Sequence, residues 1–251
     1  MKNELPSLEI IVDTIEDAIA AEQGGATQIL VCSHFPSTGV TPSYGMIARI
    51  QEKVTIPIVM QIRPHMRSCI PSEEDIEVCI QDIQAARSLG IHDFMIGFID
   101  QQNNPHCPAI QSILENCGSI RLHSHMIWEY AFDLDSCLKK LIDLQFYSVR
   151  TSGKRHTNTI FDTDATKIIN KINEVKDIAN DRIVIFLTGG ITASNLSNLV
   201  SKTQIFNLQI GRGVRSPNNS HSPVDPSKVA MVRSIQLKIF ESYSDSLGDE
   251  N

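Results

Sequence analysis

Residues 119–125 read Ser-Ile-Arg-Leu-His-Ser-His, and a helical pattern follows them at 133–145. Within the first stretch, apolar side chains alternate with Arg121, His123 and His125, which is the two-residue period of a β-strand. The second stretch carries its apolar residues at the spacing of one helix face. A strand followed by a helix forms one βα unit, and such units in series predict a parallel sheet.

The same unit recurs along the whole chain. Strand-like runs cover 8–13, 28–34, 57–64, 93–100, 119–125, 148–153, 182–188 and 205–211, and a helical pattern follows each of them. Eight βα units in 251 residues predict an α/β fold of the (β/α)8 TIM barrel type. A doubly wound open sheet has the same alternation, but no glycine-rich dinucleotide motif follows the first strand. We expect a single domain over 1–251, with its core at about 8–243 and a disordered tail at 244–251.

Composition and charge narrow the classes of function. The chain has 22 basic and 29 acidic residues, and its formal net charge of -7 argues against nucleic acid or an anionic membrane as the main partner. It contains no long apolar run and no signal-like N-terminus, so we expect a cytoplasmic protein without a membrane segment. Its 6 cysteines include no Cys-x-x-Cys pair and are expected to be free thiols. No organic cofactor motif is evident.

The inner face of the predicted barrel is unusually polar. The strand residues expected to point inward include Glu9, Gln61, Arg63, Arg121, His123, His125 and Gln209. Because buried charges need partners, Glu9 is expected to pair with one of the arginines. Two interpretations stay open: a structural network of ion pairs, or a set of groups arranged around a small polar or anionic ligand.

His125 is the inward residue nearest the functional rim, because active sites of such barrels lie at the carboxyl ends of the strands. An imidazole there can act as a general acid or base. We therefore take His125, Glu9 and Arg63 as candidate catalytic residues, with Glu129 and His156 as candidate neighbours. The alternative is that His125 is a hydrogen-bonded structural residue.

Two glycine-containing turns near the end of the chain predict a phosphate site. Gly189-Gly190 follows the seventh strand, and Gly211-Arg212 follows the eighth. Many barrels bind phosphate with the loops after these two strands, through backbone N–H groups and a helix N-terminus. Glycine lets the backbone approach the anion, and Arg212 adds positive charge. The alternative is that these glycines serve only the turns.

Cys32 and His34 share a face at the end of the second strand. A thiol beside an imidazole suits a soft metal ion such as Cu(I), or a redox role. These two residues are therefore the candidate copper ligands. The alternative is that Cys32 is a small packed core residue.

Taken together, several motifs resemble those of the copper homeostasis protein CutC family. The resemblance runs from Leu8 to about Ile210 and rests on Gly24-Gly25-Ala26, Val31-Cys32-Ser33, Thr41-Pro42-Ser43, Ile62-Arg63-Pro64, Thr151-Ser152-Gly153 and Gly189-Gly190-Ile191-Thr192. It implies a (β/α)8 barrel, a cytoplasmic location, a role in copper handling, and homo-oligomers that are often dimers. It also carries Thr151, Ser152 and Gly153 over as ligand-binding or phosphate-binding residues.

The chain departs from the family pattern at several positions where the family has other, polar residues. In this chain these positions are Ile11, Leu30, His65 and Met126. With Ile11 in the first strand, a two-cysteine copper site across strands one and two cannot form. Three functions stay open: copper binding, an enzyme that acts on a small phosphorylated or carboxylated metabolite, and a degenerate barrel that serves as a scaffold.

Overall fold

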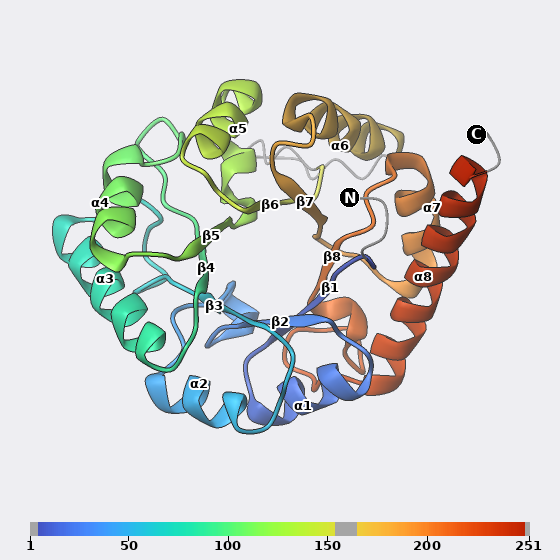
Figure 1. The fold of residues 1–251 in the computed structure, drawn as a ribbon, viewed down its shortest axis with the longest axis horizontal. Helices are drawn as coiled ribbons and strands as arrows, with labels where there is room; N and C mark the ends of the chain where they lie inside the picture. The colour runs from blue at the N-terminus through green and yellow to red at the C-terminus, as the bar shows by residue number, and fades with distance from the viewer. Residues whose placement is uncertain (1–4, 154–164, 249–251) are drawn as a thin grey trace.

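The computed structural model describes residues 5–153 and 165–248, which form a closed barrel of parallel strands in chain order (Figure 1). The strands are β1 (Leu8–Val12), β2 (Gln28–Val31), β3 (Ile58–Gln61), β4 (Asp93–Ile96), β5 (Arg121–Ser124), β6 (Ser148–Thr151), β7 (Val184–Leu187) and β8 (Leu208–Ile210). The predicted TIM barrel is confirmed.

Helices form an outer ring around the barrel, as Figure 1 shows. They are α1 (Ile15–Gln23), α2 (Tyr44–Gln51), α3 (Glu73–Ser88), α4 (Cys107–Cys117), α5 (Leu134–Asp143), α6 (Ala165–Ala179), α7 (Ala193–Thr203) and α8 (Pro226–Gly248). Within the described ranges, three 3₁₀ turns lie in the loops after β2, β5 and β8, and these are η1 (Phe35–Ser37), η2 (Met126–Tyr130) and η3 (Arg212–Val214).

Two helix ends illustrate how local sequence sets these boundaries. At the start of α3, Ser72 Oγ accepts a hydrogen bond from Asp75 N, and the Asp75 carboxylate accepts one from Ser72 N at 2.9 Å. At the other end of the chain, α8 continues to Gly248, so residues 244–248 are helical where the sequence predicts a disordered tail. The ring of Tyr243 packs against Phe206, with centroids 5.3 Å apart, and holds this last part of the helix on the barrel.

The strand side chains divide between two environments. The outer faces pack against the helices in one continuous apolar core, which includes Ile10 and Phe94. Inside the barrel, Leu30, Val59 and Met95 form a second, small apolar cluster. Ile11 packs against this cluster, and the Phe186 ring lies 4.4 Å from Arg150 Cζ. Several other strand residues that are buried are polar, and they include Glu9, His123 and Arg150.

Arg215 ties the last βα loop to the start of the chain. Its guanidinium donates to Asp17 Oδ2 at 2.7 Å and to the Ile11 carbonyl at 3.0 Å. It also lies 4.8 Å from the centroid of the Phe35 ring. Arg215 itself is only 1% exposed. This buried contact set orders a loop that is rich in Asn, Ser and Pro.

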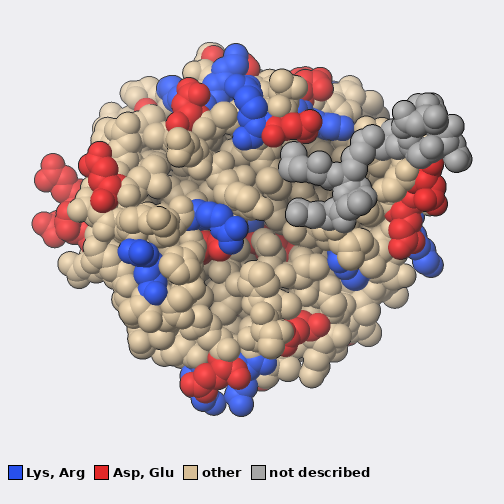
Figure 2. Space-filling model, in the orientation of Figure 1, with Lys and Arg blue, Asp and Glu red and all other residues tan. Residues whose placement is uncertain are grey.

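None of the helices among the described residues is long and apolar enough to span a membrane. On the face shown in Figure 2, basic and acidic side chains of the described residues are intermingled around the rim of the molecule.

Candidate functional site

Glu9 lies inside the barrel with no exposed surface. Its carboxylate accepts hydrogen bonds from Arg150 Nη2 at 2.7 Å to each oxygen, and from Gln209 Nε2 and Gln28 Nε2 at 2.6 Å. The expected ion pair of Glu9 is present, but its partner is Arg150 of β6 and not an arginine of β3 or β5. Burial alone raises the pKa of Glu9, yet the charge and hydrogen bonds of Arg150 outweigh it and hold that pKa below its usual value.

His123 extends this network toward the amino-terminal end of the barrel. Its Nδ1 lies 2.7 Å from Ser148 Oγ, and its Nε2 lies 2.9 Å from Asp93 Oδ1. Arg121, which is largely exposed, donates to both oxygens of Asp93 at 2.7 and 2.6 Å. Every charged side chain in this series of contacts, from Arg121 to Glu9, therefore has a hydrogen-bond or ion-pair partner. For these residues the structural interpretation of the polar interior fits the geometry.

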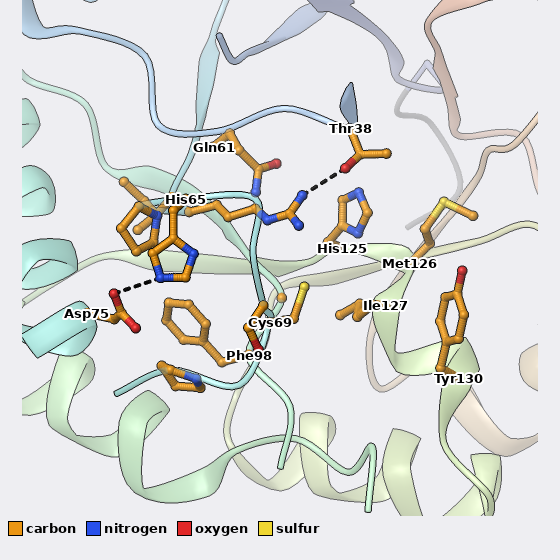
Figure 3. Close-up of a pocket in the computed structure, with 16 residues that line it drawn as sticks. Thr38, Gln61, His65, Cys69, Asp75, Phe98, His125, Met126, Ile127 and Tyr130 are labelled. Atoms are coloured by element: carbon orange, nitrogen blue, oxygen red, sulfur yellow. Dashed lines mark hydrogen bonds and ion pairs between the residues drawn. The ribbon is translucent and has the colours of Figure 1, made fainter. Parts of the chain in front are cut away.

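A cavity of about 270 Å³ opens at the carboxyl ends of β3, β4 and β5 (Figure 3). This is the end of a TIM barrel at which ligands are bound. Its polar lining includes Thr38, Gln61, Arg63, His65, Cys69, Asp75 and His125, and its apolar lining includes Phe98, Met126, Ile127 and Tyr130. Arg63 and His125, two of the predicted site residues, thus face the same cavity.

Arg63 is held in place by neutral groups. Its Nη1 donates to Thr38 Oγ1 at 2.8 Å and to the Gly39 carbonyl at 3.4 Å, and its Nη2 donates to the Met66 carbonyl at 3.4 Å. Its Nε is buried without a hydrogen-bond partner. Among the described residues no carboxylate pairs with Arg63, so the cavity contains a cation without a counter-ion.

Thr38 adopts a backbone conformation that is costly for its residue type. Its φ is 69°, in the left-handed region, where a β-branched side chain is strained. The same residue lines the cavity and accepts the hydrogen bond of Arg63. Such strain is concentrated at functional sites, because only a surrounding structure that fixes the residue can maintain it.

Gln61 and His125 complete the polar end of the cavity. Gln61 is only 4% exposed, yet among the described residues its side-chain amide has no hydrogen-bond partner. The imidazole of His125 likewise has no partner among them. Burial, together with the positive charges of Arg63 and Arg150, lowers the pKa of His125 to about 4. His125 is therefore neutral at pH 7 and can both donate and accept a hydrogen bond.

The opposite end of the cavity contains a histidine–aspartate pair that the sequence analysis does not identify. His65 Nε2 lies 3.0 Å from Asp75 Oδ1 (Figure 3). Hydrogen bonds from Ser72 are the main reason that the pKa of Asp75 lies below its usual value. The sequence identifies Asp75 only as a residue of the first helical turn, and no local pattern relates it to His65.

Gly97 is a second residue that sequence reasoning misses. A Cβ atom at this position would lie 2.9 Å from Ile127 Cγ2 and 3.3 Å from His125 Cβ. The absence of a side chain lets the loop after β5 approach the end of β4, and both segments line the cavity. The only signal in the sequence is a glycine directly after a buried strand.

Glu129 belongs to η2 after β5, and its carboxylate bonds the turn after β6. Its carboxylate accepts hydrogen bonds from Thr151 Oγ1 at 2.6 Å, from Ser152 N at 2.9 Å, from Ser152 Oγ at 2.6 Å and from Gly153 N at 3.1 Å. Burial raises the pKa of Glu129, and these hydrogen bonds oppose that effect. A phosphate bound by Thr151, Ser152 and Gly153 would have to compete with this carboxylate. His156, the other predicted neighbour of His125, lies outside the described residues.

The two predicted phosphate turns lie apart from the cavity. Gly189 and Gly190 line a separate hollow of about 200 Å³. Gly211 is covered by the Phe35 ring, because a Cβ atom there would lie 2.3 Å from Phe35 Cζ. Arg212 is exposed in η3. The structure therefore separates these turns from Arg63 and His125.

The predicted copper ligands differ in their surroundings. Cys32 is 2% exposed, and burial, followed by the negative charge of Asp13, raises the pKa of its thiol to about 12. His34 is exposed in the loop after β2. Within 5–153 and 165–248, no group of three or more His, Cys, Asp and Glu side chains is placed to hold a metal ion.

Comparison with known proteins identifies relatives along most of the chain. The sequence is 29% identical over 228 residues to the copper homeostasis protein cutC homolog of Homo sapiens, covering 91% of this chain and 80% of that protein. The mouse homolog gives the same identity and coverage. A family protein CutC of Vibrio campbellii is 28% identical over 244 residues, with 96% of both chains covered.

Solved structures show the same fold. A CutC protein of Streptococcus agalactiae superimposes with a TM-score of 0.74 at 22% identity, covering 82% of this chain and 98% of that chain. Phosphoribosyl anthranilate isomerase of Thermotoga maritima matches with a TM-score of 0.59 at 14% identity over 93% of this chain. The pattern of the CutC family matches residues 6–214, and the chain accordingly belongs to the CutC family.

Proposed function

We propose that this chain acts in the cytoplasm in copper homeostasis, the role stated in the names of its human and mouse relatives, and that its molecular activity is to bind a small organic anion in the cavity above β3–β5. The observation that carries the proposal is the convergence of Gln61, Arg63 and His125 on one end of that cavity. A concave site with a few convergent polar groups is the usual form of a small-molecule site.

The charge of the cavity lining favours a negatively charged ligand. The guanidinium of Arg63 meets only neutral acceptors, and the carboxylate nearest to it in the lining, Asp75, is paired with His65. A bound anion would supply the missing counter-charge and an acceptor for the second N–H of Arg63 Nη2, which among the described residues donates only to the Met66 carbonyl. A cationic ligand would meet repulsion from the same group.

His125 gives the site a proton acceptor. A neutral imidazole beside a bound anion can accept a proton, because the negative charge of the ligand raises its pKa from about 4 toward neutrality. This would make His125 the acid or base of any reaction in the cavity. Glu9 is fully bonded within the barrel and would contribute only through the structure.

A thermal-shift screen with small carboxylates and organic phosphates tests the proposal. A ligand that binds only the native state raises the melting temperature. We expect at least one anion to do so with the wild type, to lose its effect with Arg63→Gln, and to keep it with Arg67→Gln, a control in the same loop that is exposed and does not line the cavity. A screen without any shift at millimolar concentration would contradict the proposal.

Direct binding of Cu(I) is the second candidate function, because the relatives are named for copper homeostasis and Cys32 is a soft donor near the carboxyl end of the barrel. Binding must displace the proton of a buried thiol whose pKa is raised to about 12, so we expect a weak site. Titration of reduced protein with Cu(I) against a competing chelator tests it. Cys32→Ala should lower the affinity at least about tenfold if Cys32 is a ligand, whereas Cys79→Ala, at another buried cysteine, should not.

A further inference from the structure

The geometry points to a more specific ligand, and this inference rests on the function proposed above. We infer that the cavity above β3–β5 takes a monocarboxylate joined to a planar apolar group, and that Gln61 and Arg63 bind the carboxylate while Phe98, Ile127 and Tyr130 contact the apolar group. The proposed function allows either a carboxylate or a phosphate as the ligand, and this inference favours the carboxylate.

The number of cations in the cavity favours a ligand with a single negative charge. Arg63 is the one lining residue in the described part of the chain that carries a positive charge without a carboxylate partner, since His65 is paired with Asp75. His125 is neutral at pH 7. A phosphate monoester carries a charge of about −1.5 to −2 at that pH and would keep an excess of negative charge in a half-enclosed site. A carboxylate carries one charge, which Arg63 matches.

The hydrogen-bonding groups match two carboxylate oxygens. The Gln61 amide is nine-tenths buried, lines the cavity and has no partner among the described residues. Its NH₂ group can donate to one oxygen, and Nη2 of Arg63, which within the described ranges donates only to the Met66 carbonyl, has a second N–H for the other. Figure 3 places Gln61, Thr38 and His125 together at one end of the cavity. A ligand oxygen at this end would give the Gln61 amide a hydrogen-bond partner that the described residues do not supply.

The other walls are apolar and partly aromatic. Phe98, Met126, Ile127 and Tyr130 line the cavity, and in Figure 3 the rings of Phe98 and Tyr130 lie on opposite sides of Cys69. A flat apolar group can pack against such rings and side chains, which adds to the free energy of binding in proportion to the area that it removes from water. The cavity volume of about 270 Å³ limits the ligand to a small molecule.

The decisive experiment compares three matched probes: 3-phenylpropionate, its neutral amide 3-phenylpropionamide, and phenyl phosphate. Binding is followed by NMR of protein labelled at the methionine methyl groups, because Met126 lines the cavity and Met231 is exposed on α8. We expect 3-phenylpropionate to shift the Met126 signal and leave the Met231 signal unchanged. The amide and phenyl phosphate should bind at least about tenfold more weakly.

Two variants connect the result to the proposed carboxylate contacts. Arg63→Gln should weaken binding of 3-phenylpropionate at least about tenfold, and Gln61→Leu should weaken it several-fold, while Arg67→Gln should leave it unchanged. Gln61→Leu removes no hydrogen bond within the described protein and serves as the second variant if Arg63→Gln fails to fold.

The outcomes separate this inference from the function on which it rests. If phenyl phosphate binds more tightly than 3-phenylpropionate and depends on Arg63, the carboxylate inference is wrong and the anion site stands. Equal binding of the carboxylate and its amide also overturns the inference. If none of the three probes shifts Met126 and no anion raises the melting temperature, both the inference and the proposed function fail.

Discussion

His123 lies in β5 and His125 directly follows that strand, yet the two histidines belong to two different regions of the barrel. His123 bonds Ser148 and Asp93 and is part of the chain of polar contacts that reaches Glu9. His125 lines the mouth cavity, and its imidazole has no hydrogen-bond partner among the described residues. The pKa of both imidazoles lies below the usual value, with burial as the main cause.

The difference shows how buried polar groups can be sorted into structural and functional sets. Polar groups that bond each other stabilise one arrangement of the protein and offer little to a ligand. Polar groups that line an accessible cavity without a partner in the protein can bond a ligand without breaking existing contacts. β5 and the residue that follows it therefore contribute to a structural network in the barrel interior and to a candidate binding site at its mouth.

Breaking the Glu9–Arg150 pair should have the largest effect. Arg150→Met leaves the carboxylate of Glu9 buried without its cation and should lower the free energy of unfolding by about 3–5 kcal/mol. Denaturation in urea at pH 7 measures this loss. In the double variant Glu9→Leu with Arg150→Met, much of the stability should return, because both charges are replaced by apolar groups. A single variant as stable as the wild type would show that the pair is not structural.

His125 should make the stability of the protein depend on pH. The folded state keeps its pKa at about 4, below the value of about 6.5 expected in the unfolded chain, so the unfolded state binds more protons between these values. This residue therefore contributes stability above pH 6.5 that is lost as the pH falls toward 4, up to about 3 kcal/mol. The loss of stability between pH 7 and 4.5 should be smaller in His125→Asn than in the wild type. Equal losses in the two proteins would contradict the lowered pKa.

The third prediction concerns Glu129 and the turn after β6. Glu129→Ala removes the acceptor for two backbone N–H groups and two hydroxyls and should cost about 2 kcal/mol of stability. Glu129→Gln should retain most of that stability because the amide can still accept and donate there. Glu115→Ala, an exposed position on α4, provides the control. A loss no larger than that of the control would show that the turn after β6 does not depend on Glu129.

Two glutamines give the smallest predicted effect and the most direct comparison. Gln61→Leu at the mouth should change stability by less than about 0.5 kcal/mol, because no hydrogen bond among the described residues is lost. Gln209→Leu removes bonds to Glu9 and Thr188 and should cost about 1.5–3 kcal/mol. Equal costs for the two variants, measured by denaturation, would show that the division between bonded network and open mouth is wrong.

The sequence predicts the fold, and it singles out Arg63 and His125, two residues that line the candidate cavity, for identifiable reasons. Strand and helix periods repeat eight times, and the alternation in 119–125 correctly turns His123 and His125 inward. The strand that contains Arg150 has no clear polar alternation, so the sequence predicts an arginine partner for Glu9 but does not indicate which arginine. The contact of His65 with Asp75, and the close approach that Gly97 permits, depend on how separate loops fold back over the barrel, which no local pattern encodes.

The Arg215 contacts with Asp17 and Phe35 join segments about two hundred positions apart in the chain, at the seam where β1 meets β8. Bringing such remote segments together has a high entropic cost before any contact forms. The seam should therefore close late in folding. A ribosome-bound chain would hold seven strands without their eighth neighbour until synthesis is almost complete, with the edges of β1 and β7 open to wrong pairing during that interval.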